Sequence, residues 1–380
     1  MIEKSMVAEL TNYKEGTNPV TSAYITVDNN VENRDKHIIE LKKMIQYKKG
    51  TSYFKELEEN NQTSVLKDFD KILDWVKNNF DTKEYNSAII FSSERTGYWK
   101  TIVLKQKLDN QIEIHSKPYI RPLTTLFDDY RKYAVVLVDK AKGRIFESNY
   151  GDFSELSKIQ DEDIEDLKTG GFQGMDERKI ERNNHKYIIE NYKKIAEEIF
   201  KIDQKKNYNW IIIGGRKEST AEFEKYLHNY VKNKISGHII VQPDANINKV
   251  LDEIKKTEQE ARMAFERKYL ELLNQKRQKQ MAAEGIDEII QAAKAQQIDT
   301  LFVKENFKIK GRYCRHDHFI TDEMLDTCPE CGSQLERTDD LIEHILHMTV
   351  NQSSKIKYVN GIFDEHGKIA AYLRYPLISQ

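Results

Sequence analysis

Apolar positions along the chain follow two spacings, one typical of strands and one typical of helices. Short runs rich in β-branched residues predict strands, whereas apolar residues three or four positions apart over longer stretches predict helices. In residues 1–129 we expect strands at 20–27, 87–91, 102–104 and 111–115, with helices at 35–50 and 64–79. This first part of the chain is therefore predicted to be an α/β domain.

The same alternation predicts a second α/β domain, residues 130–246. A hairpin of two strands is expected over 133–147, and a long, charged helix over 175–206. A buried strand at 209–215, a helix at 220–233 and a strand at 238–241 follow. Strands that alternate with helices imply layers of helices packed on a sheet.

The third predicted domain, residues 247–380, opens with a long charged helix over 247–283. A helix from Gly285 and a strand at 300–303 come next, and a helix at 339–348 and a strand at 356–359 follow later. A short segment at about 311–336, which contains all the cysteines, separates the two halves of this domain. The sequence thus predicts the α/β fold class, with three α/β domains and a small knuckle inserted in the last one.

The composition limits how a partner can be bound. The net charge of the 380-residue chain is about −2, so binding to nucleic acid must come from local patches rather than from the overall charge. No run approaches 18 apolar residues, and the start at Met1 lacks the apolar stretch of a signal peptide. We therefore expect a cytoplasmic protein that does not bind a membrane.

A glycine-rich stretch in the second domain, residues 168–174, is followed at once by the long charged helix. Glycine reaches positive φ and lets the backbone approach another surface closely, so Gly170 and Gly171 predict an exposed loop whose only reactive side chain is Gln173. The first turns of the helix are basic, with Arg178, Lys179, Arg182, His185 and Lys186. This arrangement suggests a tip that faces a polyanion; the alternative is an ordinary joint between a loop and a helix.

The three cysteines, Cys314, Cys328 and Cys331, lie in one short window. This clustering argues against a secreted disulfide framework and for one metal site in a cytosolic protein. Cys328 and Cys331 are separated by two residues and followed by Gly332, which permits the tight turn of a thiolate knuckle. The pattern is one half of a zinc ribbon.

The other half of the site must come from Cys314 and one neighbour. His318, His316 and Asp317 all lie within four residues of Cys314. Ligand spacings of two to four favour His318, and aspartate is a less usual ligand of structural zinc. The predicted site is a closed, structural zinc site of Cys314, His318, Cys328 and Cys331; the alternative is three free cysteines beside a solvated pair of histidines.

These features together resemble the archaeo-eukaryotic class-one translation termination factors and their relative Pelota, especially the bacterial branch of that superfamily. The resemblance covers essentially the whole chain. It rests on Gly170-Gly171-Phe172-Gln173 with the basic helix, on residues 286–303, on the inserted cysteine knuckle and on the ending 367–376. Arg121-Pro122-Leu123 is similar to the junction between the family's first two domains.

The resemblance implies a tRNA-mimicking arrangement of the three domains and entry into the ribosomal A site. The first domain would lie on the decoding-site side. The Gly-Gly-Gln-like loop would reach the peptidyl-transferase centre, where Gln173 would help to position water against the ester of peptidyl-tRNA. The helix with Arg178, Lys179, Arg182 and Lys186 would contact phosphates of ribosomal RNA. The third domain would bind a translational GTPase, and any GTP hydrolysis would belong to that partner because this chain has no nucleotide motif.

Two departures from the family pattern narrow the expected function. Phe172 separates Gly171 from Gln173, which shifts the glutamine by one residue, and the first domain lacks the family's codon-reading signatures. We therefore expect action on stalled or idle ribosomes without stop-codon reading. The two hypotheses are a rescue factor, in which Gln173 promotes peptidyl-tRNA hydrolysis, and a non-catalytic hibernation factor. An RNA-processing endonuclease is disfavoured because the acidic run at 161–166 is too contiguous for a two-metal site.

Overall fold

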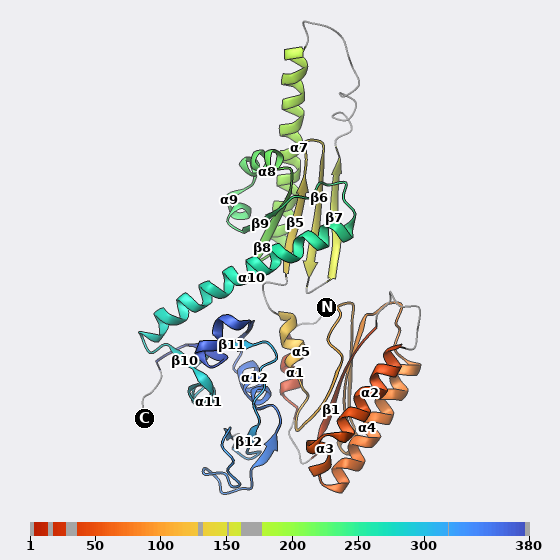
Figure 1. The fold of residues 1–380 in the computed structure, drawn as a ribbon, viewed down its shortest axis with the longest axis vertical. Coiled ribbons are helices and arrows are strands. Elements are labelled where there is room, and N and C mark those ends of the chain that lie inside the picture. Colours follow the sequence, from red (N-terminus) through yellow and green to blue (C-terminus); the bar gives the residue numbers. More distant parts are fainter. Residues whose placement is uncertain are drawn as a thin grey trace. The chain divides into compact units, whose positions relative to one another are not determined.

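The computed structural model describes residues 4–13, 18–27, 36–127, 132–149, 152–160, 177–317 and 319–376 (Figure 1). The chain divides into two compact units. One unit joins residues 1–128 to residues 268–380, and the other comprises residues 129–267. The mixed α/β, multi-domain character expected from the sequence is confirmed, while the domain boundaries at 129/130 and 246/247 stay predictions.

The N-terminal part of the first unit is an antiparallel sheet of strand order β3-β2-β1-β4. Its strands are β1 (Val20–Thr26), β2 (Ser87–Ser93), β3 (Tyr98–Leu104) and β4 (Gln111–His115). Three helices lie on one face of this sheet: α2 (Lys36–Gly50), α3 (Ser52–Glu56) and α4 (Glu59–Asn78) (Figure 1). Leu41, Phe69 and Ile90 are at the centre of the core between these layers. The predicted strands are thus present, and the second predicted helix starts five residues earlier than 64.

The C-terminal part of the first unit contains a mixed sheet of order β10-β16-β11-β15. Its strands are β10 (Ala282–Glu284), β11 (Ile298–Lys304), β15 (Lys355–Val359) and β16 (Ile369–Leu373). Helices α11 (Gly285–Lys294) and α12 (Leu341–Asn351) cover one face through Ile289 and Leu346. Leu273 of helix α10 (Ile247–Arg277) packs against Phe302 in a second, smaller core of this part.

A small antiparallel sheet of order β13-β12-β14 is inserted between β11 and α12. It consists of β12 (Gly311–Tyr313), β13 (Ile320–Thr321) and β14 (Glu336–Thr338). We call residues 311–338 the ribbon. The expected insertion at about 311–336 therefore exists as a separate small sheet, and it carries all three cysteines.

The second unit is a five-stranded sheet of order β7-β6-β5-β8-β9. Its strands are β5 (Lys132–Val138), β6 (Lys142–Asn149), β7 (Asp152–Gln160), β8 (Trp210–Gly215) and β9 (Ile235–Ile239). β5 pairs antiparallel with β6 and parallel with β8. Helices α7 (Glu177–Lys206), α8 (Lys217–Phe223) and α9 (Asn229–Lys232) pack on one face, and the first part of α10 packs on the other.

Two predicted helices differ from the observed ones. The helix expected over 247–283 ends at Arg277, because Gln280 has a positive φ of 57° and residues 282–284 pair with β16 instead. The helix expected over 220–233 is broken after Phe223, and α9 begins only at Asn229. In the first case tertiary strand pairing overrides the helical propensity of alanine.

Buried charges join the two parts of the first unit. Arg121, in the short helix α5 (Arg121–Thr124), pairs with Asp340 at the start of α12, with 3.2 Å between Nη1 and Oδ2. Their side chains are only 8% and 1% exposed. Arg121 Nη2 also donates to the carbonyl of Phe307 (2.7 Å), and Tyr119 Oη donates to Asp340 Oδ2 (3.1 Å). This ion pair is therefore held in place by uncharged partners on both sides.

The same helix α12 contributes two more buried groups to this contact. The backbone N–H of Ile120 donates to the carboxylate of Glu343, and His347 Nε2 lies 2.9 Å from the carbonyl of Pro118. We call the contact of residues 115–124 with 340–347 the junction. Its polar groups come from segments more than two hundred residues apart in the sequence.

Candidate functional site

The three cysteines and Asp317 form one cluster in the ribbon. One ligand atom of each of Cys314, Asp317, Cys328 and Cys331 lies within 4.8 Å of all the others. The Sγ atoms of Cys314 and Cys331 are 3.5 Å apart, and Cys328 Sγ lies 3.0 Å from Asp317 Oδ2. Three sulfurs and one carboxylate oxygen thus surround a common centre.

Two turns of the same construction build this cluster. The N–H of Cys314 donates to the carbonyl of Phe319 (2.7 Å), and the N–H of Cys328 donates to the carbonyl of Ser333 (2.7 Å). In each turn the acceptor residue lies five positions after the donor cysteine. Position three after the first cysteine is Asp317 in one turn and Cys331 in the other, so Asp317 holds the place of a second cysteine.

Local backbone geometry fixes both turns. Gly332 has a φ of +72°, and its N–H donates to the carbonyl of Cys328 (2.9 Å). A positive φ favours glycine because it has no Cβ, which explains the glycine directly after Cys331. In the other turn the N–H of Phe319 donates to Asp317 Oδ1 (2.9 Å), leaving Oδ2 directed at the sulfurs.

Burial and hydrogen bonding give the cluster groups different proton affinities. Burial raises the pKa of Cys314 to about 12 and also raises the pKa of Cys328. A hydrogen bond with Ser333 lowers the pKa of the exposed Cys331. Burial raises the pKa of Asp317, but hydrogen bonds from the thiols and from the Phe319 N–H outweigh it and lower this pKa far below its usual range.

This donor set suits a soft, four-coordinate cation. Thiolates select zinc or iron, and carboxylate oxygen is an accepted fourth ligand of zinc. A cation at the centre would also hold the buried thiols in their thiolate form. Of the predicted metal ligands, Cys314, Cys328 and Cys331 therefore lie together; His318 lies outside the described residues, and the described cluster does not include His316.

The repeated turn is the signal that could have identified Asp317 from the sequence. Cys314-x2-Asp317 has the same spacing as Cys328-x2-Cys331. Histidine is a more usual ligand of structural zinc than aspartate, and the choice of His318 on this ground overlooks the repeat. Ser333, which contacts Cys331 Sγ at 3.2 Å, is a second residue that the spacing rules do not indicate.

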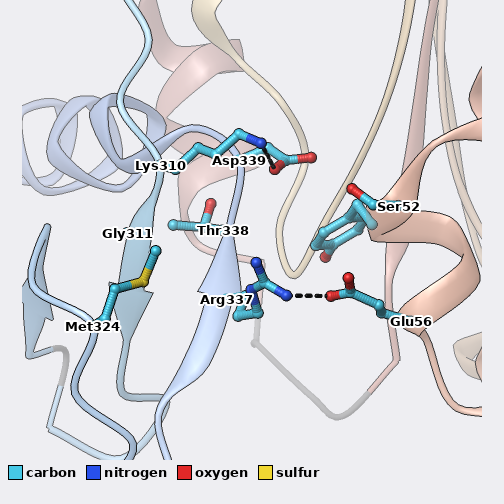
Figure 2. A pocket seen from close by; sticks show the side chains of 9 residues that line it. Ser52, Glu56, Lys310, Gly311, Met324, Arg337, Thr338 and Asp339 are labelled. Carbon is cyan, nitrogen blue, oxygen red and sulfur yellow. Dashed lines mark hydrogen bonds and ion pairs between the residues drawn. The ribbon is translucent and has the colours of Figure 1, made fainter.

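The ribbon contacts the N-terminal helices of its own unit. Arg337 of β14 pairs with Glu56 of α3, with 2.6 Å between Nη1 and Oε2, and Figure 2 shows the two side chains pointing toward one another. Lys310 and Asp339 form a second, longer pair at 3.8 Å. Between these pairs lies a cavity of about 30 Å³ lined by Ser52, Tyr53 and Thr338, among others. The cysteine–aspartate cluster therefore belongs to a segment that contacts helix α3 of the N-terminal part.

The predicted loop and basic helix are described only in part. Gly170, Gly171 and Gln173 lie outside the described residues. Helix α7 begins at Glu177, so Arg178, Lys179 and Arg182 occupy its first turns, although their side chains lie outside the description. Lys186 is exposed, whereas Tyr192, Ile195 and Ile199 are buried against the sheet. The two predicted basic residues whose side chains are described, His185 and Lys186, thus face solvent.

Part of the chain matches a known family. Residues 118–259 match the family described as bacterial archaeo-eukaryotic release factor family 10. This segment contains the glycine loop, α7 and the whole sheet of the second unit. The match supports the bacterial branch of the superfamily that the sequence motifs indicate.

Known proteins give more distant similarities over a longer stretch. A peptide chain release factor subunit 1 from Methanococcoides burtonii is 19% identical over 334 residues, which cover 77% of this chain and 78% of that protein. Dom34 from S. cerevisiae, a translation termination-like factor that interacts with Hbs1, has a TM-score of 0.41 at 14% identity, covering 79% of this chain and 83% of that chain. An archaeal Pelota, from a model of ribosome-bound Pelota and ABCE1, has a TM-score of 0.40 at 10% identity, covering 99% and 95%.

The resemblance to the release-factor and Pelota superfamily, bacterial branch, is confirmed by the family match and the archaeal relative. Within the described part of the chain, no helix has both the length and the apolar character needed to cross a membrane.

Proposed function

We propose that this release-factor- and Pelota-like chain binds the A site of stalled or idle ribosomes without reading a stop codon. The observation that carries the proposal is the family match over residues 118–259, because it contains both the loop with Gln173 and the basic helix α7. The likeness to an archaeal release factor over most of the chain supports the same assignment. The ribosome, with its RNA and peptidyl-tRNA, is the proposed partner.

Helix α7 supplies the proposed contact with ribosomal RNA. Its first turns hold Arg178, Lys179 and Arg182, and its inner face is fixed by Tyr192 and Ile195 in the core. A helix N-terminus carries a partial positive charge that adds to these basic residues. Contacts of this kind bind phosphates independently of sequence, which suits a protein that acts without reading a codon.

The proposed chemistry centres on Gln173. In the rescue hypothesis, Gly170 and Gly171 let the loop enter the peptidyl-transferase centre, and the amide of Gln173 orients a water molecule against the ester of peptidyl-tRNA. The hydroxyl of the water then bonds to the acyl carbon, the bond from that carbon to the 3′-oxygen breaks, and the other proton of the water passes to the 3′-oxygen of the tRNA. Positioning alone supplies much of such a rate enhancement.

A non-catalytic hibernation factor is the second candidate. The specific observation in its favour is Phe172, which separates Gly171 from Gln173 and displaces the amide by one residue. In this case α7 holds the protein in the A site of an inactive ribosome and Gln173 is dispensable.

The remaining parts of the proposal concern the domains, the partner of the third domain and the zinc ion. We assign residues 1–129, 130–246 and 247–380 to three domains, with the third contacting a translational GTPase and the whole protein acting in the cytoplasm. A structural zinc ion would be held by Cys314, Cys328 and Cys331. The fourth ligand is Asp317 by the symmetry of the two turns, in place of the His318 that spacing predicts.

Peptide release from stalled ribosomes separates the two candidates. Purified ribosomes carrying peptidyl-tRNA in the P site and a sense codon in the A site are mixed with wild type, Gln173→Ala, or Gln204→Ala, an exposed glutamine of α7 that serves as the control. If the protein is a rescue factor, only Gln173→Ala loses release. Deletion of Phe172, which restores Gly-Gly-Gln, should then raise the rate.

Binding is measured in parallel by co-sedimentation with ribosomes at several salt concentrations. Lys186→Glu should weaken binding and flatten its salt dependence by about one counterion. Binding without release in every variant supports hibernation. Absence of salt-dependent binding to ribosomes would refute the proposed function in both forms.

A further inference from the structure

A groove on the N-terminal sheet is lined by none of the residues of α7 and by none of the ribbon cysteines. It is formed by α2 and the edge strand β4, and we call it the α2–β4 groove. Its volume is about 340 Å³, within the range of small-ligand sites. The lining residues are Lys43, Met44, Tyr47, Lys48, Asn110, Gln111, Ile112 and Glu113.

Tyr47 is the most unusual residue of this groove. It is 76% exposed, although tyrosine is a residue type of intermediate burial. The core face of α2 consists of His37, Leu41 and Ile45, which recur every four residues. Tyr47 is two residues past Ile45, and residues two apart do not share a helix face, so packing within the fold does not explain the ring.

The surface around Tyr47 is basic. Helix α2 contains five lysines and one glutamate. Lys43 lies one turn before Tyr47 and therefore on the same face. The one carboxylate that lines the groove, Glu113, is already engaged by Lys48 at 2.5 Å and by Lys308 at 3.0 Å. Lys43 pairs with Glu40 of its own helix at 2.8 Å. The excess positive charge at the groove therefore comes from Lys48 and Lys308, which share the single carboxylate of Glu113.

The opposite wall offers amide groups beside an apolar floor. Gln111 begins the edge strand and Asn110 directly precedes it. The N–H of Thr26 donates to Asn110 Oδ1 (2.6 Å), which fixes that amide in place. Met44, which is half buried, also lines the groove. A projecting aromatic ring, lysines and amides on one groove are the groups that bind an unpaired nucleotide by stacking, phosphate contact and hydrogen bonding to a base edge.

We propose that the α2–β4 groove binds single-stranded RNA, with a base stacked on Tyr47 and the neighbouring phosphates beside the lysines of α2. Single-stranded rather than double-stranded RNA is favoured because the bases of a duplex are stacked on each other and leave no face for Tyr47. The inference goes beyond the proposed function, because it involves neither Gln173 nor α7. It gives the first predicted domain an RNA contact that requires no codon identity.

Binding of a fluorescent, unstructured oligoribonucleotide to the full-length protein tests this inference. Tyr47→Ala should weaken binding roughly tenfold, the effect of removing one stacking aromatic. Tyr47→Phe keeps the ring and should bind within about twofold of wild type. Tyr230→Ala removes an exposed tyrosine of the second unit (47%) and serves as the control, with no expected change. Circular dichroism confirms that each variant is folded.

Cross-linking locates the contact directly. An oligoribonucleotide that contains 4-thiouridine, irradiated with the wild-type protein, should label the peptide containing Tyr47, and a duplex of the same sequence should not. Equal binding by wild type and Tyr47→Ala would overturn the inference, as would cross-links confined to other peptides. The groove binds an acidic protein segment instead if polyglutamate competes fully with the oligoribonucleotide and Tyr47→Ala leaves RNA binding unchanged.

These outcomes are separate from those of the proposed function. Lys186→Glu is expected to weaken binding to ribosomes and to leave the cross-link at Tyr47 in place. One outcome is that Tyr47→Ala abolishes the cross-link while no protein, wild type or variant, binds ribosomes. This outcome would support RNA binding by the groove and refute the A-site proposal.

Discussion

Charged side chains occupy two contrasting regions of the first unit, and they do different work there. At the junction, Arg121 and Asp340 are almost wholly buried and each has further hydrogen-bonding partners. Along α2, by contrast, Lys43 is mostly exposed and pairs only with Glu40 of its own helix. The charges of the first region serve internal contacts, whereas the paired but mostly exposed Lys43 can still be reached by an external partner.

The difference follows from desolvation. A buried ion pair gains from a low dielectric but has lost its hydration, so removing one partner leaves a costly isolated charge. Burial raises the pKa of Asp340 to about 6 even though Arg121 lowers it, which shows how strongly this carboxyl is dehydrated. Exposed pairs contribute about 0–1 kcal/mol. Stability should therefore depend on the junction, whereas the proposed RNA binding should depend on the exposed lysines.

The proposed zinc site of Cys314, Asp317, Cys328 and Cys331 is a second set of interacting polar groups, and removal of its ion should have the largest effect. Binding of zinc to structural sites contributes about 10–16 kcal/mol at neutral pH. Removal of the metal with a chelator should unfold the ribbon and accelerate amide hydrogen exchange in β12, β13 and β14. Strands β5 and β8 of the second unit should keep their protection. Hydrogen exchange followed by mass spectrometry measures both.

Single substitutions identify the fourth ligand. Asp317→Asn should weaken metal affinity more than about a hundredfold and so reduce the metal content. This loss exceeds the one expected for a residue that only hydrogen-bonds to a ligand. His316→Asn is the matched control and should retain the metal. Elemental analysis of the purified proteins decides the matter: loss of metal in His318→Ala with retention in Asp317→Asn would restore the ligand predicted from spacing.

Loss of Arg121 should have the next largest effect. Arg121→Met keeps much of the side chain's volume but leaves Asp340 buried without its cation, and the free energy of unfolding should fall by about 3–5 kcal/mol. Arg337→Met is a matched control across the same unit, because the pair of Arg337 with Glu56 is 54% and 52% exposed and should cost at most about 1 kcal/mol. Urea unfolding followed by circular dichroism measures both. Similar losses in the two variants would contradict the contrast drawn between buried and exposed charges.

The sequence predicts the α/β elements of both regions far better than it predicts the contacts between them. The apolar runs of β1, β5 and β8 are visible because burial imposes β-branched residues on them. The partners of Arg121 are not visible, since Asp340 lies 219 residues further along the chain and no local pattern links the two. Strand β10 is missed because Ala282 and Ala283 favour a helix until β16 pairs with them. Asp317 is weighed but not preferred, because only the folded turns show that it matches Cys331.

A buried and an exposed histidine give the finest test of the same contrast. His115, at the junction, is 7% exposed and stacks on Tyr119 with 5.1 Å between ring centres. Burial lowers the pKa of His115 to about 4, although the carboxylates of Glu113 and Glu343 raise it. Because the unfolded chain protonates this histidine near pH 6.5, it binds a proton that the folded state does not accept. Stability from this group is therefore complete above about pH 6.5 and is lost as the pH falls toward 4.

His115→Gln should remove that acid sensitivity. Between about pH 7 and pH 4.5 the variant should lose roughly 2 kcal/mol less stability than wild type. Asp340, whose raised pKa acts in the opposite direction, is present in both proteins and cancels in the comparison. His238→Gln, which removes a 54% exposed histidine of the second unit that pairs with Glu224 at 2.6 Å, is the comparison variant. Urea midpoints across this pH range measure the difference; an unchanged profile in His115→Gln would mean that the folded junction accommodates the imidazolium, and that burial there excludes charge less strongly than the contacts of Arg121 imply.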